Sequence, residues 1–210
     1  MIIEQIQVTP MVVFCYLLVD EDTGEAVIID PGGQPKKILE KVEARGAKVK
    51  WVVDTHAHVD HTAGNRRVMS RTGAGLLIHE LEAPRLRSFS HAVFSLFLRG
   101  MLSPAPSGLL KHDDIITFGK SRLSVIHTPG HSAGGICLYS EGDLFTGDTL
   151  FTEGTGRTDL AGGSERELIE SLRDRIFTLP DDTLIWPGHN YGRSPVSTVK
   201  KQKDLYRALL

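Results

Sequence analysis

THAHVDH, residues 55–61, places three histidines and one aspartate within six residues. It directly follows the apolar run Val49–Asp54, whose composition is typical of a buried strand. In an extended loop His56 and His58 point the same way, because side chains alternate with a period of two. Asp60 and His61 then point elsewhere, toward a second position. Imidazole and carboxylate groups are ligands that suit Zn, Fe or Mn, so the stretch predicts a metal site rather than a solvated histidine-rich loop.

Three later segments repeat this arrangement at the ends of short apolar runs. They are TPGHS (128–132), TGD (146–148) and PGH (187–189), and the donors they add are His131, Asp148 and His189. Each donor has a glycine beside it, which lets the backbone turn tightly and approach a ligand closely. A single histidine or aspartate of this kind is more often structural. Together with residues 55–61, however, they predict seven donors delivered by four strand-end loops of one scaffold.

The remaining pattern predicts an α/β protein. Apolar runs predict strands over 11–20, 25–30, 49–54, 75–79, 123–127, 135–140, 143–146 and 183–186. Helical spacing predicts helices over 35–45, 63–71, 164–177 and from about 194 onward. Strands outnumber helices, so we expect a two-sheet sandwich with helices outside. No linker or internal repeat appears, and we expect one domain over residues 1–210.

The segment 83–112 is unusual because it contains no acidic residue. Its basic residues are Arg85, Arg87, Arg99 and Lys111. Apolar side chains recur every four residues, which indicates a helix, at Phe89, Val93, Phe97 and Met101. The first interpretation is a helix packed on the core. The alternatives are an insertion that acts as a lid over a site, or one that forms a contact between two copies of the chain.

Composition and charge exclude several classes of protein. The chain has 210 residues, of which 40% are hydrophobic, so it is not a disordered chain. A net charge of −2 provides no general attraction to nucleic acid or to an anionic membrane. No apolar stretch approaches the roughly 18 residues that a membrane span needs. We therefore expect no nucleic-acid or membrane partner, a small-molecule substrate, and a homodimer as an open alternative.

The cysteines and the N-terminus bear on the compartment. The two cysteines, Cys15 and Cys137, lie in apolar runs and are expected to be core residues of a protein in a reducing environment. The N-terminus carries Glu4 where a secretory signal would carry positive charge, so we expect no signal peptide. Together these features predict a cytoplasmic protein.

THAHVDH followed in order by TPGHS, TGD and PGH resembles the metallo-β-lactamase-fold hydrolases over essentially the whole chain. The resemblance implies a four-layer αββα sandwich with two divalent metal ions. Zinc is the expected metal, and iron or manganese are the alternatives. It implies that the first ion is held by His56, His58 and His131, and the second by Asp60, His61 and His189. Asp148 would bridge the two ions, and Asp60 would also act in catalysis by orienting a metal-bound hydroxide.

The segment GRTDL, residues 156–160, is similar to the corresponding segment of short glyoxalase II-like hydrolases and of persulfide dioxygenases. The first branch implies cleavage of a thioester of the hydroxyacylglutathione type. The second implies one Fe(II) held by His56, His131 and Asp148, with the other four donors around it. A lactonase or phosphodiesterase on the same site is a third alternative.

Residues for substrate are expected beside these motifs. The candidates are Arg157, Asn190 and Tyr191. Arg157 can bind an anionic group with its planar guanidinium, or it can pair with Asp159. Because the chain ends soon after His189, we expect it to lack the C-terminal helical region with which hydroxyacylglutathione hydrolases contact glutathione.

Overall fold

The computed structural model describes residues 1–9, 11–97 and 100–207. Its contacts divide the chain into two compact units. The first unit is Met1–Leu110 with Ile116–Arg122, and the second is Lys111–Ile115 with Leu123–Leu210. Among the described residues no helix combines the length and the apolar character that crossing a membrane requires.

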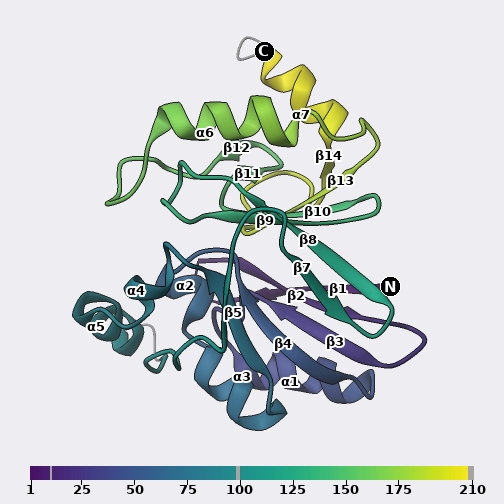
Figure 1. The fold of residues 1–210 in the computed structure, drawn as a ribbon, viewed down its shortest axis with the longest axis vertical. Coiled ribbons are helices and arrows are strands. Elements are labelled where there is room, and N and C mark those ends of the chain that lie inside the picture. Colours follow the sequence, from purple (N-terminus) through teal and green to yellow (C-terminus); the bar gives the residue numbers. More distant parts are fainter. Residues whose placement is uncertain (10, 98–99, 208–210) are drawn as a thin grey trace. The chain divides into compact units, whose positions relative to one another are not determined.

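The first sheet has six strands in the order of the chain (Figure 1). They are β1 (Ile2–Val8), β2 (Val13–Val19), β3 (Glu25–Ile29), β4 (Lys48–Asp54), β5 (Gly75–His79) and β6 (Gly108–Leu110). The β1–β2 and β2–β3 pairs are antiparallel, and the following three pairs are parallel. The carboxyl ends of β3, β4 and β5 therefore lie at one edge of the sheet.

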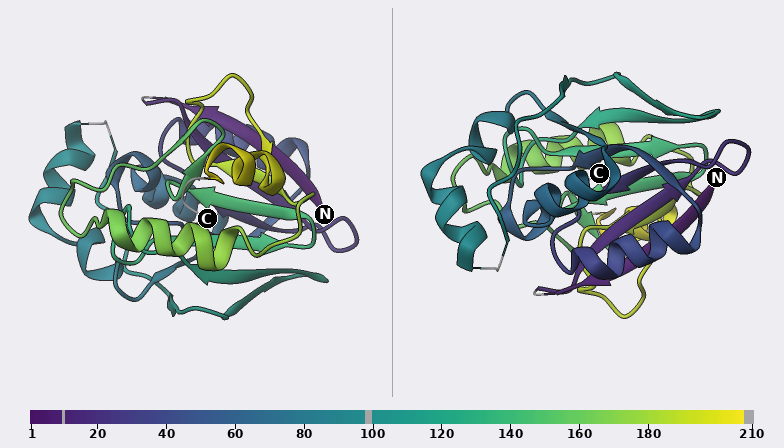
Figure 2. Two further views of the ribbon diagram at one scale, coloured as in Figure 1. Left: turned by 90° about the horizontal axis from the view of Figure 1, so that it is seen from above. Right: turned by 90° about the horizontal axis from the view of Figure 1, so that it is seen from below.

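The described residues of this unit also form helices. They are α1 (Pro35–Ala44), α2 (Val59–Thr62), α3 (Asn65–Thr72), α4 (Ala83–Leu86) and α5 (Phe89–Phe97). The helices α1 and α3 lie across one face of the strands, as the view from below shows (Figure 2, right). Their inward side chains Ile38 and Val68 are fully buried in a cluster with Val52 and Leu76. Burial of each such side chain contributes about 1.5–3 kcal/mol, which holds the helices on the sheet.

The second sheet is also mixed and has the order β14-β13-β10-β9-β8-β7. Its strands are β7 (Ile115–Phe118), β8 (Ser121–His127), β9 (Ile136–Ser140), β10 (Asp143–Gly147), β13 (Leu184–Pro187) and β14 (Ser197–Thr198). Because β9 is antiparallel to both β8 and β10, and β10 is parallel to β13, the strands β8, β10 and β13 run in one direction. The three loops that follow these strands therefore leave the same edge.

Short elements complete the second unit. A small hairpin pairs β11 (Leu150–Phe151) with β12 (Gly154–Thr155). The sheet is covered by α6 (Glu165–Ser171), a π-helical turn over Leu172–Ile176, and α7 (Val199–Leu205), shown in green and yellow in the view from above (Figure 2, left). Hydroxyl side chains cap both α-helices, since Ser164 accepts from the Glu167 amide and Thr198 from the Lys201 amide.

The α/β class is confirmed, and differences from the predicted elements are local. The strand β1 was not predicted, because Glu4, Gln5 and Gln7 interrupt its apolar residues. The short helix α2 was predicted as loop. The last helix begins at Val199 rather than near 194, where the chain still forms a loop and β14. Cys15 and Cys137 are both buried and free, as expected for core residues.

The stripe in 83–112 is helical over Phe89–Phe97, but its packing on the core was predicted wrongly. On α5 the exposed fraction is 86% for Phe89 and 47% for Val93. Met101 lies beyond the helix and is 40% exposed. Arg99 and the side chain of Phe97 are outside the described part of the structure. A lid and a contact between copies both stay predictions for this segment.

Polar atoms on the inner face of α5 attach it to α2. His91 and Ser95 are buried, and His91 Nε2 lies 2.9 Å from the Thr62 hydroxyl. That hydroxyl donates to the carbonyl of His58 at 3.1 Å. Burial lowers the pKa of His91, and the charge of Arg85 lowers it further, so the neutral imidazole is favoured. The helix is thus bonded to the segment that carries the histidine motif.

Candidate metal centre

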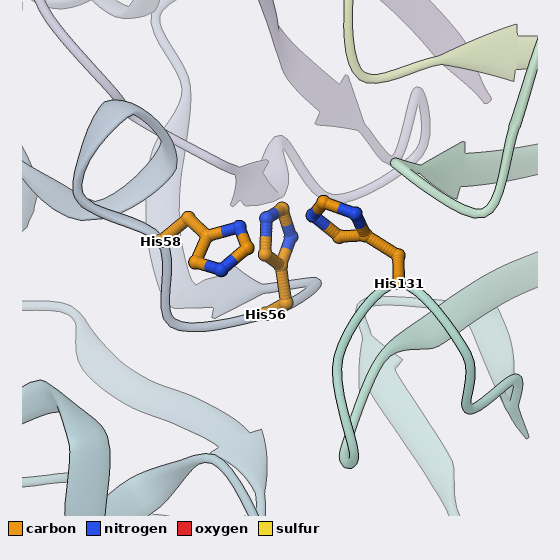
Figure 3. A group of neighbouring side chains, drawn as sticks. All are labelled: His56, His58 and His131. Carbon is orange, nitrogen blue, oxygen red and sulfur yellow. The ribbon is translucent and has the colours of Figure 1, made fainter. Parts of the chain in front are cut away.

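The first donor set lies in the loop after β4 and on α2. His56 and His58 lie with their ring centroids 4.6 Å apart and nearly perpendicular, as the period-two geometry predicts. Figure 3 shows both rings on the loop that leads from β4 to α2. The ring of His61, on α2, is 4.3 Å from that of His56, and its Nε2 is 3.7 Å from Asp60 Oδ2. All four predicted donors of this unit therefore gather at the carboxyl end of β4.

A buried carboxylate that the sequence analysis missed holds this loop. Asp30 directly follows β3 and is 1% exposed. Its Oδ1 accepts from the Thr55 amide at 2.7 Å, and its Oδ2 lies 2.7 Å from the Thr55 hydroxyl and 2.9 Å from His61 Nδ1. Because Asp30 bonds to Nδ1 of His61, Nε2 is the atom of that ring left to bind a metal. A carboxylate is a usual second partner of a metal-binding histidine. The signal was present in the sequence, because Asp30 ends the strand next to β4.

Asp54 is a second buried acid at this edge. Its Oδ2 accepts from the side-chain amide of Asn65 at 2.7 Å, and that amide also reaches Ser103 Oγ at 2.9 Å. Burial raises the pKa of the Asp54 carboxyl well above its usual value, and the nearby charge of Asp30 raises it further. These contacts join the end of β4 to α3 and to the chain beyond α5.

A glycine lets the Asp30 segment approach α2. A Cβ on Gly32 would lie only 1.5 Å from the backbone oxygen of Asp60. No side chain fits there unless the backbone moves, so the glycine keeps the Asp30 loop against the segment that carries Asp60 and His61.

The second donor set comes from the aligned strand ends of the second unit. His131 follows β8, Asp148 follows β10, and His189 follows β13. Asp148 Oδ2 lies 3.5 Å from His131 Nε2 and 3.3 Å from His189 Nε2. All three residues are at least nine-tenths buried. One carboxylate oxygen thus faces the ligand nitrogen of two histidines, the arrangement expected of a bridging ligand.

The ring of His131 is oriented by a backbone carbonyl. Its Nδ1 donates to the carbonyl of Arg157 at 2.8 Å, which leaves Nε2 free of its proton and facing Asp148. Figure 3 shows this ring on its loop between β8 and β9. A Cβ on Gly156 would lie 2.0 Å from the Asp148 carbonyl and 2.8 Å from His131 Nδ1. Glycine at 156 is therefore required for the close packing that makes this hydrogen bond.

Aromatic rings hold His189. The ring of Tyr191 stacks on it with centroids 4.4 Å apart and an interplanar angle of 11°, and Phe151 meets it edge-on at 5.8 Å. Tyr191 was predicted to bind substrate. Its observed contact is with a predicted ligand, and its 49% exposed surface keeps the substrate role as a proposal. Asn190 is exposed, and its role also stays a prediction.

Arg157 forms the ion pair that was one of its two predicted roles. Its Nε and Nη2 donate to the two carboxylate oxygens of Asp159 at 2.7 and 2.6 Å. Both side chains are largely exposed. The paired guanidinium lowers the pKa of the Asp159 carboxyl to about 2. An exposed pair of this kind contributes little to stability, so the guanidinium can exchange Asp159 for an anionic ligand at small cost.

Replacing Arg157 by glutamine is expected to raise the pKa of Asp159 above about 2, because the carboxylate loses its charged donor. A carboxyl-carbon NMR titration would measure the change. Arg193→Gln removes an exposed arginine of the same unit that pairs with Glu153, and serves as the control. An Asp159 titration that is the same in Arg157→Gln and in the parent protein would contradict the pairing.

The donor set fits a divalent metal ion. It consists of imidazole nitrogens and carboxylate oxygens. In His56, His61 and His131 the Nδ1 atom is bonded to a protein oxygen, so Nε2 is the atom available to a metal. This is the chemistry by which Zn, Fe and Mn sites are built and oriented. Thiolate ligands are absent from the described donors, since both cysteines are buried within strands.

Comparison with known proteins agrees with this chemistry. The family model described as the metallo-β-lactamase superfamily matches residues 8–189. The chain belongs to that superfamily. The match runs from the end of β1 to His189 and includes every predicted metal ligand. The fold is accordingly the metallo-β-lactamase fold, with two mixed six-stranded sheets and flanking helices, and the protein is a metal-dependent enzyme with a histidine-rich site.

Two relatives of this superfamily chain have different activities. The chain is 36% identical over 182 residues to the hydroxyacylglutathione hydrolase of Polaromonas sp., and the aligned region covers 85% of this chain and 62% of the relative. The chain is also 36% identical over 196 residues to the human mitochondrial persulfide dioxygenase ETHE1, and this aligned region covers 91% of this chain and 69% of the relative. The chain thus spans about two thirds of the length of either relative.

A solved structure in the superfamily matches over nearly its full length. The crystal structure of the BLEG-1 B3 metallo-β-lactamase superposes with a TM-score of 0.87 at 32% identity, covering 97% of each chain. Relatives with three different names therefore share this fold, and the fold alone does not select the substrate.

Proposed function

We propose that the protein is a binuclear metallohydrolase that cleaves a thioester of the hydroxyacylglutathione type. In this proposal, following the motif pattern of the superfamily, His56, His58 and His131 hold one ion, and Asp60, His61 and His189 hold the other. Asp148 is the shared ligand between them. Zinc is the expected metal, with iron or manganese as the alternatives.

The position of Asp148 carries the proposal. Its Oδ2 is within 3.5 Å of Nε2 of both His131 and His189, residues assigned to different ions. A single carboxylate oxygen between two histidine ligands favours two ions over one. The number of donors points the same way, because a mononuclear site would use three of the seven.

When bound, the ions would supply Lewis acidity that polarises the acyl carbonyl and activates water at neutral pH. The residues of the chain then have separate tasks. Asp60 orients the attacking water, and the exposed guanidinium of Arg157 binds a carboxylate of the substrate. The thiolate that departs is a good leaving group, so the chain needs no strong general acid beside it.

The persulfide dioxygenase reaction is the second candidate, favoured by the 36% identity to the human enzyme. It would use one Fe(II) on His56, His131 and Asp148, with open positions for O₂ and the persulfide. The remaining donors would then orient these three ligands. A lactonase or phosphodiesterase reaction is a third use of the same donors.

The test is to measure metal content and activity on the same purified sample. We expect two ions per chain and hydrolysis of an S-(hydroxyacyl)glutathione thioester that is lost after chelation and restored by Zn²⁺. Oxygen uptake with glutathione persulfide and a simple lactone complete the panel. One iron per chain with O₂ consumption on the persulfide would overturn the hydrolase in favour of the dioxygenase. A protein that binds no divalent metal would overturn both.

A further inference from the structure

Glu82 is a buried acid near the histidine motif. It is neither a proposed metal ligand nor part of the proposed catalytic steps. It lies between β5 and α4, and its residue is 0% exposed. Its Oε2 accepts from the backbone amide of Ala57 at 2.9 Å. Ala57 stands between His56 and His58, so the contact reaches the centre of the predicted ligand pair.

The parallel sheet explains why Glu82 arrives there. The strands β4 and β5 pair in parallel, with Asp54 opposite Ile78. Their carboxyl ends therefore lie side by side, and a residue that follows β5 by a few positions is placed beside the loop that follows β4. The Glu82 amide bonds to the carbonyl of His79 at 2.9 Å, which turns the chain back toward that loop.

From this contact we infer that Glu82 is a positioning residue for the metal site. The Ala57 amide fixes the plane of the peptide that joins it to His56, and that plane decides whether the two imidazoles stay on the same side of the loop. The hydrogen bond is charge-assisted and buried, which makes it short and directional. The carboxylate also places negative charge beside two ligands, an arrangement that favours a bound cation.

The inference rests on the proposed metal site, and Co²⁺ provides a probe that reports on ligand geometry. Affinity is measured by competition with a chelator, geometry by the visible absorption of bound Co²⁺, and folding by thermal unfolding of the metal-free protein. The variants are Glu82→Ala, which removes the acceptor, and Glu82→Gln, which keeps an oxygen at the same place. Glu80→Ala, an exposed glutamate two residues away, is the matched control.

We expect Glu82→Ala to weaken Co²⁺ binding by about 10–100-fold, the usual loss when an outer partner of a ligand is removed, and to change the absorption bands. Glu82→Gln should recover the bands and part of the affinity, because it keeps the acceptor oxygen but loses the charge. Glu80→Ala should match the parent protein. Parent-like affinity and bands in Glu82→Ala would overturn the inference. So would a lower unfolding temperature with unchanged affinity and bands, which is the result of a merely structural role.

If Glu82→Ala does not fold, Glu82→Asp takes its place, because the shorter side chain draws the acceptor away from Ala57. Weaker binding with altered bands would then support the inference, and parent-like binding would overturn it. Failure of the proposed function is distinguished by the parent protein. A parent that binds no metal refutes the site, whereas a parent and Glu82 variants that bind equally refute only the role of Glu82.

Discussion

Replacing Asp148 by alanine is expected to lower metal affinity by more than about 100-fold. Loss of a residue that orients a ligand lowers metal affinity by about 10–100-fold, and loss of a ligand itself should lower it further. Hydrolysis of the thioester should fall by at least the same factor. The carboxylate lies between His131 and His189, with its Oδ2 at 3.5 and 3.3 Å from their Nε2 atoms. Alanine removes both the shared oxygen and its negative charge.

Metal content by elemental analysis and kcat/KM on the thioester measure the effect. Asp182→Ala, an exposed aspartate of the same unit, is the matched control and should leave both values unchanged. Asp148→Asn retains the shape and one carbonyl oxygen, so we expect a loss between those of the alanine variant and the control. An alanine variant that keeps two ions and full activity would refute the assignment of Asp148 as the shared ligand.

Replacing Asp30 by asparagine is expected to destabilise the metal-free protein by about 3 kcal/mol, the upper range for hydrogen bonds to a charged group. Its carboxylate oxygens accept from the Thr55 amide, the Thr55 hydroxyl and His61 Nδ1. The amide group of asparagine offers one acceptor oxygen, and its nitrogen would face donors. Metal affinity should also fall, because His61 loses the bond that directs its Nε2.

The backbone makes asparagine a clean substitution at this position. Asp30 has a φ of 50°, in the left-handed region that asparagine adopts about as readily as aspartate. Chemical denaturation of the metal-free protein and chelator competition measure the two effects. Asp22→Asn, an exposed aspartate that pairs with Lys120, is the control. An Asp30→Asn protein with unchanged stability would show that the network around Thr55 contributes nothing.

Much of the fold was predictable because several strands, such as β2 and β5, are buried on both faces. β5 was predicted at its observed bounds, Gly75–His79, since it is a short apolar run between turn residues. β1 was missed because it lies at the edge of its sheet and the polar residues Glu4, Gln5 and Gln7 interrupt its apolar residues. The burial of α5 could not be predicted, because a four-residue spacing indicates a helical face but not whether that face turns inward. There the buried residues His91 and Ser95 are polar, and Phe89 is exposed.

The donors of the site could be named from the sequence, because they stand beside glycines at strand ends in a dense and recurring pattern. The residues that orient them could not. Asp30 and Glu82 are single acids separated from the motif by about 25 residues, and each reaches the loop only through the parallel pairing of β3, β4 and β5. The hydrogen bond from His131 is accepted by the backbone carbonyl of Arg157. Because every residue type has such a carbonyl, the sequence does not predict this bond.

The hydrogen bond between α5 and α2 has a defined donor and a defined acceptor. Because the Thr62 hydroxyl gives its only proton to the carbonyl of His58, His91 must donate to it from Nε2. His91 Nδ1 then accepts the proton of Ser95, whose Oγ lies 3.4 Å away. A second proton on the ring would turn that acceptor into a donor, and the contact within α5 would reverse, since the serine oxygen can also accept. Acid would therefore reverse the hydrogen bond within α5 and leave the direction of the bond from His91 to Thr62 unchanged.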